Sequence, residues 1–120
     1  PLFKAKGDMI VKLPDSGEHQ VDAYGDYERD GVKHLWVAEC KYRKSEPMTA
    51  REVEKALEAA EVVREIRNAR DMKVWLVSTG GFTRDALALI EKSGCLFSGL
   101  DEINEIARLY GIGVKIVEFV

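Results

Sequence analysis

The chain has 120 residues, of which 46% are hydrophobic and 32% charged, and these values are typical of one compact globular domain. No apolar stretch has the length that a membrane-spanning helix requires, and a net charge of -3 from interspersed acidic and basic residues argues against a protein that coats polyanions in general. The two cysteines and two histidines do not have the spacing of a zinc site, so we expect reduced thiols and a cytoplasmic location.

Three strands are predicted in the N-terminal third of the chain. They cover residues 9–13, 18–27 and 32–42. A Pro-Asp-Ser-Gly turn separates the first two strands, and an Asp-Gly pair at residues 30–31 predicts a two-residue hairpin turn between the second and the third. Gly25 indicates a bend or a bulge within the second strand.

Helices and strands alternate in the rest of the chain. Thr49 and Glu52 have the spacing of a capping box, and apolar residues recur at helical spacing from there to about residue 69. The remaining predicted elements are an apolar strand at 73–79, a helix at 84–93, a short strand at 95–97, a helix at 100–111 and a last strand at 114–120. A hairpin followed by alternating helices and strands predicts a single α/β domain over residues 1–120 with a mixed sheet.

The predicted hairpin brings polar side chains together. If the Asp-Gly pair forms the turn, the ladder places Asp22 opposite Glu39 and Gln20 opposite Lys41, with all four side chains on one side of the sheet. A bulge at Gly25 would shift this register by one residue.

Two opposed carboxylates, those of Asp22 and Glu39, repel each other, and burial makes the repulsion worse. A shared proton, the ammonium group of Lys41 or a divalent cation would relieve it. Oxygen donors without nearby His or Cys are those that Mg²⁺ or Mn²⁺ prefers, and an ammonium group beside such a cation suits phosphate chemistry. A structural ion pair in which Lys41 bridges the two acids fits the same spacing.

Two segments resemble the PD-(D/E)XK, or restriction endonuclease-like, nuclease superfamily. Asp22, a hairpin and then Glu39-Cys40-Lys41 match its D…(D/E)xK motif. The segment VWLVSTGGFTRDALAL at residues 74–89 is similar to one in Mrr-like restriction endonucleases and their archaeal relatives. The resemblance implies a restriction endonuclease-like fold, in which a mixed β-sheet is flanked by helices on both faces.

The resemblance also implies an activity. The protein would be a nuclease, more readily an endonuclease than an exonuclease, that hydrolyses DNA phosphodiester bonds with Mg²⁺ or Mn²⁺. Asp22, Glu39 and the backbone carbonyl of Cys40 would bind the metal ion, and Lys41 would position or deprotonate the attacking water. Products with a 5′-phosphate and a 3′-hydroxyl would follow, and a homodimer or further domains of a longer chain would complete the enzyme.

Further residues are assigned around this motif. Gln20 and Glu52 are accessory candidates, the latter because family members often carry a Gln, Glu or Lys on the next helix, although its capping role already explains it. Arg43 and Lys44 would contact DNA phosphates, and a solvated strand end would look the same. The helix that usually begins the family's core is missing, or residues 1–8 are its remnant, so we expect a fragment of a longer protein.

Other interpretations remain open on sequence alone. The chain could be a nuclease-fold module that binds DNA or oligomerises without catalysis. It could also be a small nucleotide-binding regulatory domain that uses the Ser-Thr-Gly-Gly turn at 78–81, although that turn matches neither GxGxxG nor the Walker pattern. Arg64, Arg67 and Arg70 either follow a DNA backbone or form a surface face favoured by the helix dipole.

Overall fold

A computed structural model describes residues 4–13 and 17–109. One mixed sheet has the strand order β1-β2-β3-β4-β5. The pairs β1–β2 and β2–β3 are antiparallel, and β3–β4 and β4–β5 are parallel. The elements are β1 (Lys4–Leu13), β2 (Gly17–Arg29), β3 (Val32–Lys41), α1 (Ala50–Ile66), β4 (Asp71–Ser78), α2 (Arg84–Ser93), β5 (Leu96–Ser98) and α3 (Leu100–Leu109).

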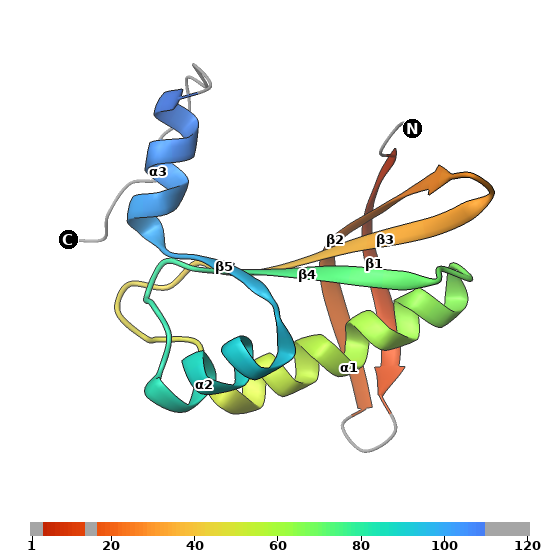
Figure 1. Cartoon of the computed structure of the whole chain (residues 1–120). Coiled ribbons are helices and arrows are strands. Elements are labelled where there is room, and N and C mark those ends of the chain that lie inside the picture. The colour runs from red at the N-terminus through yellow and green to blue at the C-terminus, as the bar shows by residue number, and fades with distance from the viewer. Residues whose placement is uncertain (1–3, 14–16, 110–120) are drawn as a thin grey trace.

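The helices lie on both sides of this sheet. In Figure 1, α1 and α2 lie below it, and α3 rises above it beside β5. This arrangement confirms the predicted α/β class. Within the described residues, no helix is long and apolar enough to cross a membrane.

The N-terminal end of the chain differs from the expectation. The first strand begins at Lys4 rather than at residue 9, so the idea that residues 1–8 are a helix remnant is wrong for residues 4–8. Gly7 lies in this extension with a φ of 91°, at a point where the register between β1 and β2 shifts. The predicted last strand at 114–120 lies outside the described residues.

The predicted capping box begins α1. The Thr49 hydroxyl accepts the backbone N–H of Glu52 over 3.2 Å, and the Glu52 carboxylate accepts that of Thr49 over 3.1 Å. The buried face of the helix consists of small side chains, which let it lie close to the sheet: Val53, Ala56, Ala59, Ala60 and Val63. Its buried partners on the strands include Val11, Val21, Leu35, Val37 and Leu76.

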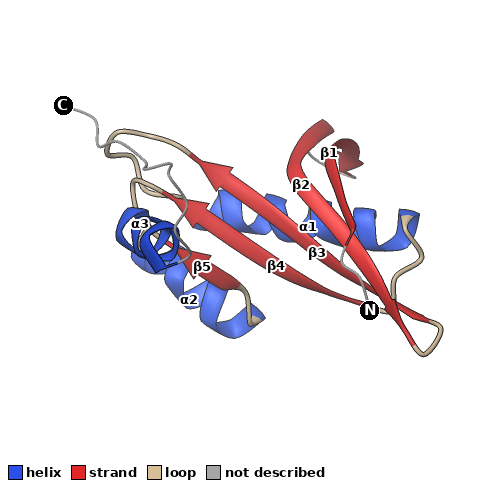
Figure 2. Cartoon of the chain, turned by 90° about the horizontal axis from the view of Figure 1, so that it is seen from above, coloured by secondary structure: helices blue, strands red, loops and turns tan. Residues whose placement is uncertain are grey.

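The second strand pairs with β1 at both ends of that ladder but with β3 only in part. Residues 17–21 and 24–26 pair with β1 and residues 23–29 pair with β3, whereas residues 17–21 have no register with β3 (Figure 2). Val21 is fully buried and Tyr24 packs against the core, so two exposed residues, Asp22 and Ala23, separate these inward-facing side chains instead of one. This is a β-bulge, and beyond it β2 diverges from the end of β3.

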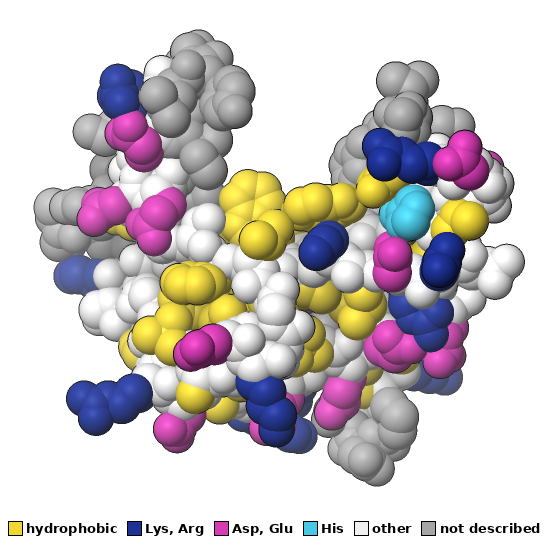
Figure 3. Space-filling model, viewed as in Figure 1, with side chains coloured by type: hydrophobic (Ala, Val, Ile, Leu, Met, Phe, Trp, Pro, Cys, Tyr) yellow, Lys and Arg dark blue, Asp and Glu magenta, His cyan; other side chains and the backbone are white. Residues whose placement is uncertain are grey.

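The sheet face opposite α1 carries half-buried aromatic residues. Trp36 and Trp75 alternate with buried residues that face the helix, and Trp75 Nε1 donates to Ser98 Oγ over 3.0 Å. Figure 3 shows hydrophobic side chains in the saddle between α3 and the end of the molecule formed by β1 and β2. The cover that α3 gives to this face is therefore partial.

Two loops pack tightly where β3 and β4 end. Met48 N–H donates to the Gly81 carbonyl over 2.9 Å, and Thr83 N–H donates to the Met48 carbonyl over 3.0 Å. A Cβ atom on Gly80 would overlap the backbone carbonyl of Glu46. The close approach of these two backbones requires glycine at position 80.

We predict that Gly80→Ala lowers the free energy of unfolding by about 2 kcal/mol, because backbone atoms rather than a flexible side chain must move. Gly99→Ala is the matched control, since its Cβ would meet the Glu102 side chain at 3.5 Å and the Ser78 carbonyl oxygen at 3.8 Å, both of which are ordinary contact distances. Urea denaturation of both variants measures the difference. Equal losses of stability would contradict the packing of the two loops.

Candidate active site

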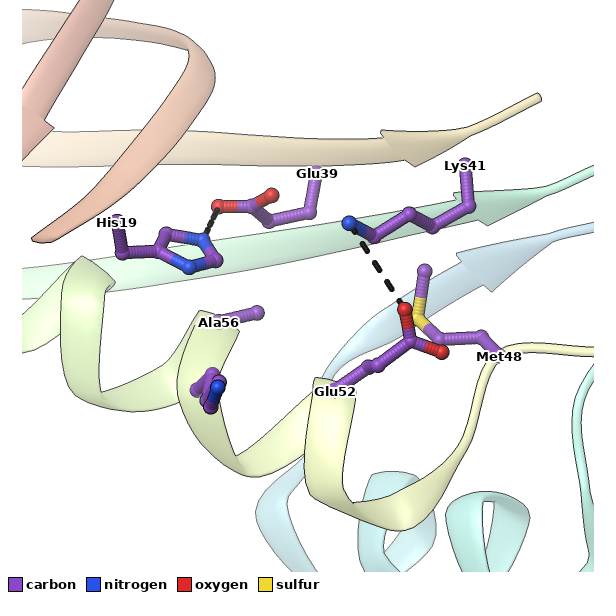
Figure 4. Close-up of a pocket in the computed structure, with 7 residues that line it drawn as sticks. His19, Glu39, Lys41, Met48, Glu52 and Ala56 are labelled. Carbon is purple, nitrogen blue, oxygen red and sulfur yellow. Dashed lines mark hydrogen bonds and ion pairs between the residues drawn. The ribbon is translucent and has the colours of Figure 1, made fainter. Parts of the chain in front are cut away.

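A pocket of about 200 Å³ lies between the end of β3 and the first turns of α1 (Figure 4). Two acidic and three basic side chains line it together with two apolar ones. The lining residues are His19, Glu39, Lys41, Met48, Glu52, Lys55 and Ala56. The sequence motif therefore contributes Glu39 and Lys41 to one concave, charged site.

Glu39 is the most buried ionisable residue of this pocket, at 2% exposed. Its Oε1 accepts a hydrogen bond from His19 Nε2 over 2.9 Å. Burial raises the pKa of Glu39, the hydrogen bond from His19 lowers it, and the negative charge of Asp22 raises it further. Burial therefore disfavours the ionised form of Glu39, and a nearby cation would stabilise that form.

Asp22 approaches β3 at the bulge. Its Oδ2 accepts the backbone N–H of Cys40 over 2.7 Å. The N–H and C=O groups of a strand residue point toward the same neighbouring strand, so the Cys40 carbonyl also points toward β2, where the ladder has ended. The Lys41 carbonyl points the other way and accepts the N–H of Thr79 over 3.1 Å. The Asp22 carboxylate and the Cys40 carbonyl thus share one edge of β3.

The predicted hairpin register holds from Arg29–Val32 to Ala23–Ala38 and stops there. The expected pairings of Asp22 with Glu39 and of Gln20 with Lys41 are absent from this register, because the bulge reverses which side chains of β2 face inward. Asp22 is exposed and is not one of the residues that line the pocket. Gln20 Nε2 donates instead to Asp8 Oδ2 over 2.9 Å, at an exposed position.

His19 takes the inward position and lines the pocket. His19 was not among the site residues predicted from the sequence. The β1–β2 register shifts beside Gly25, as the sequence indicated, but the extra residue there lies on β1, between Ala5 and Gly7. The bulge of β2 itself is at residues 22–23, so no spacing in the sequence indicated that His19 faces inward.

The residues that the motif assigns to a metal ion offer only oxygen donors. They are the carboxylates of Asp22 and Glu39 and the backbone carbonyl of Cys40, and Mg²⁺ and Mn²⁺ prefer oxygen. Among the residues that the structure describes, no three side chains of His, Cys, Asp or Glu are grouped to hold a metal ion. A cation here would therefore need the Cys40 carbonyl and water oxygens in addition to the carboxylates.

Glu52 connects the helix to the basic residues at the end of β3. Its carboxylate accepts two hydrogen bonds from the Arg43 guanidinium, and its Oε2 lies 3.8 Å from Lys41 Nζ. The hydrogen bonds from Arg43 lower the pKa of Glu52 to about 2. Glu52 is therefore ionised near neutral pH, and its capping role and its contact with Lys41 coexist.

Thr79 fixes the backbone that follows Lys41. Its hydroxyl accepts the N–H of Arg43 over 2.8 Å and donates to the Arg43 carbonyl over 2.8 Å. The turn at 78–81 thus holds the end of β3, and the Glu46 backbone fills the space beside Gly80. Lys44, the other predicted phosphate contact, is exposed at this end of the strand.

Two arginines of the predicted helical stripe have partners within the fold. Arg64 bonds to Glu61 and donates to the Ala69 carbonyl over 2.9 Å. Arg67 Nε lies 3.0 Å from Oδ2 of Asp26, which is 6% exposed. These contacts connect the end of α1 to its surroundings and favour the interpretation of the stripe as part of the fold.

Comparisons with known proteins add two structural likenesses. No protein-family model matches the chain, and no curated protein matches its sequence. The crystal structure of AF1548, a protein of unknown function, has a TM-score of 0.66 at 18% identity, over 96% of this chain and 64% of that one. A repair endonuclease from Pyrococcus abyssi has a TM-score of 0.50 at 22% identity, over 79% of this chain and 39% of that one.

The chain thus spans less than two thirds of the length of either structure, at 64% and 39%. At identities of 18% and 22%, these likenesses concern the fold alone. The mixed sheet of this chain, with α1 packed beneath it, is a fold that it shares with a repair endonuclease.

Proposed function

We propose that the protein is a divalent-metal-dependent deoxyribonuclease that hydrolyses phosphodiester bonds, more readily as an endonuclease. The observation that carries this proposal is the buried Glu39 carboxylate beside Asp22, with Lys41 in the same pocket. The D…(D/E)xK motif and a fold shared with a repair endonuclease support it.

Each residue would have a distinct task. Asp22, Glu39 and the Cys40 carbonyl would hold Mg²⁺ or Mn²⁺, and the chemistry that such an ion supplies when bound is activation of water and stabilisation of negative charge on phosphate oxygens. Lys41 would orient the attacking water and offset charge that develops in the transition state. Glu52 would position Lys41, because its Oε2 lies 3.8 Å from the ammonium group.

DNA would lie across the end of β3. Arg43 and Lys44 follow the motif, and Lys55 lines the pocket from α1, so all three are proposed to contact phosphates on either side of the scissile bond. A second copy of the chain or further domains would extend this surface, and cutting of both strands favours a symmetric dimer.

The test is cleavage of plasmid, single-stranded and branched DNA with Mg²⁺, with Mn²⁺ and with EDTA. We expect cleavage that requires the metal ion and falls about 100-fold or more in Asp22→Asn, the scale on which loss of one electrostatic contributor lowers kcat. Asp8→Asn is the matched control, because Asp8 is an exposed acid on the neighbouring strand that bonds to Gln20. Metal-independent cleavage, or equal rates in the two variants, would contradict the proposal.

A second candidate is a nuclease-fold module that binds DNA without cutting it. The observation that favours it is that no group of three His, Cys, Asp or Glu side chains is placed for a metal ion in the described part of the chain. Binding of DNA in EDTA, with no cleavage in either metal, would support this candidate. A nucleotide-binding domain has less support, because the Glu46 backbone occupies the space at Gly80.

A further inference from the structure

A hydrogen bond in the pocket that the motif does not explain joins His19 and Glu39. His19 lies on β2 before the bulge and pairs with Val11 of β1. Its Nε2–H donates to Glu39 Oε1 over 2.9 Å, and the two side chains are 16% and 3% exposed. A hydrogen bond this well shielded from water holds the two side chains in a defined arrangement.

This contact has a clear consequence for the carboxylate. It uses Oε1 of Glu39 and so fixes the rotation of the carboxyl group. Burial is the largest influence on Glu39 and favours its neutral form, and the hydrogen bond from His19 is the largest influence in the opposite direction. Without His19, the Glu39 carboxylate would be free to turn and would lose its main stabilising partner.

We propose that His19 is a positioning residue of the active site, whose imidazole holds the Glu39 carboxylate in the orientation in which it binds the metal ion. Carboxylates that bind metals are commonly oriented in this way by a hydrogen bond from an outer residue. The inference rests on the proposed nuclease function and assigns to that site a residue that the D…(D/E)xK motif does not contain.

The chain offers a matched control for this role. His34 is the only other histidine, and its Nδ1 lies 2.8 Å from Asp71 Oδ1, so it also forms a histidine–carboxylate pair. It precedes Glu39 by five positions on β3, which corresponds to about 16 Å along a strand, and the alternation of side chains places it on the opposite face. A metal ion at the proposed site would be near His19 and far from His34.

The first test follows the two imidazole rings by nuclear magnetic resonance, with His34→Gln used for assignment. Substoichiometric Mn²⁺ is expected to broaden the His19 ring signals and to leave those of His34 sharp. Mg²⁺, added in a separate titration, is expected to shift the His19 signals alone. These measurements use the intact wild-type chain and require neither DNA nor cleavage.

The second test uses variants. His19→Ala is expected to raise the Mg²⁺ concentration for half-maximal cleavage by about 10- to 100-fold, the usual effect of removing an outer residue from a metal site. His19→Gln, whose amide can still donate to Oε1, should recover most of the wild-type requirement, and His34→Ala should leave it unchanged. Circular dichroism establishes that each variant is folded.

The outcomes separate the two proposals. If the wild type cleaves DNA with Mg²⁺ but Mn²⁺ leaves the His19 signals sharp, the inference fails and the nuclease proposal stands. The inference also fails, and the nuclease proposal stands, if His19→Ala is folded and needs the same Mg²⁺ concentration as the wild type. If the wild type neither cleaves DNA nor binds Mn²⁺, the proposed function fails and the inference fails with it. If His19→Ala does not fold, the wild-type titration and His19→Gln decide.

Discussion

Replacing Lys41 by alanine is expected to reduce Mg²⁺-dependent DNA cleavage by about 1,000-fold, within the range that a residue acting on the attacking water contributes. The Lys41 side chain lies in the pocket with Glu39, and its ammonium group is 3.8 Å from Glu52. Its side chain is 33% exposed, so its removal leaves no large cavity and the fold should persist. Single-turnover cleavage rates at saturating metal and DNA measure the effect.

Lys73→Ala is the control for this experiment, because Lys73 is an exposed lysine on β4, on the sheet face opposite α1. Its cleavage rate should equal that of the wild type. A Lys41→Ala variant that cleaves within about threefold of the wild type would show that Lys41 does not act on the reacting groups.

Glu39→Gln is expected to change activity and stability in opposite directions. Loss of the carboxylate should lower the proposed DNA cleavage by about 100-fold or more, because the proposed metal ligand is removed. At neutral pH and without metal, the variant should be more stable than the wild type by about 1 kcal/mol, because a neutral amide replaces a buried carboxylate. Guanidinium denaturation in EDTA measures this gain.

The gain in stability should depend on pH. Burial raises the pKa of Glu39 above its ordinary value of 4.5, so the folded protein holds this proton more tightly than the unfolded chain. Stability of the wild type therefore falls as pH rises from that ordinary value through the raised pKa, and it remains lower above it. The advantage of Glu39→Gln should accordingly vanish at acid pH. Glu58→Gln, at an exposed position on α1, should show no such dependence.

Local signals in the sequence predicted most of the fold. The capping box at Thr49 and Glu52 involves residues three apart, so its hydrogen bonds do not depend on distant parts of the chain. The Asp-Gly turn likewise determined the register of β2 with β3 as far as Ala23–Ala38. Both signals reflect interactions between residues that are close in sequence. Such interactions can be predicted without knowledge of the tertiary structure.

The bulge could not be located in this way. Gly25 suggested a bulge in β2, but Gly25 is buried and pairs with Trp36 within the regular part of the β2–β3 ladder. The actual position of the bulge depends on how Val21 packs against α1 and on where β2 leaves β3, and these are tertiary effects. His19 and Gln20 are both polar, so hydrophobic periodicity did not distinguish the side chain that faces inward.

The candidate site was predictable only in part for the same reason. Glu39 and Lys41 are two residues apart on one strand, so alternation alone places them on one side. The hydrogen bonds between Arg43 and Glu52 join a strand to a helix through the loop between them. No periodic pattern in the sequence predicts a contact of this kind, because the contact depends on the conformation of the loop.

The bulge also determines which genetic changes β2 can accept. Deletion of Ala23 would leave a single residue, Asp22, between Val21 and Tyr24, which is the spacing of a regular strand. Val21 and Tyr24 would then both face inward without a bulge, so the interior would keep its present side chains. A substitution in this strand leaves the bulge in place, whereas the loss of this one codon would remove the irregularity that brings Asp22 to the edge of β3.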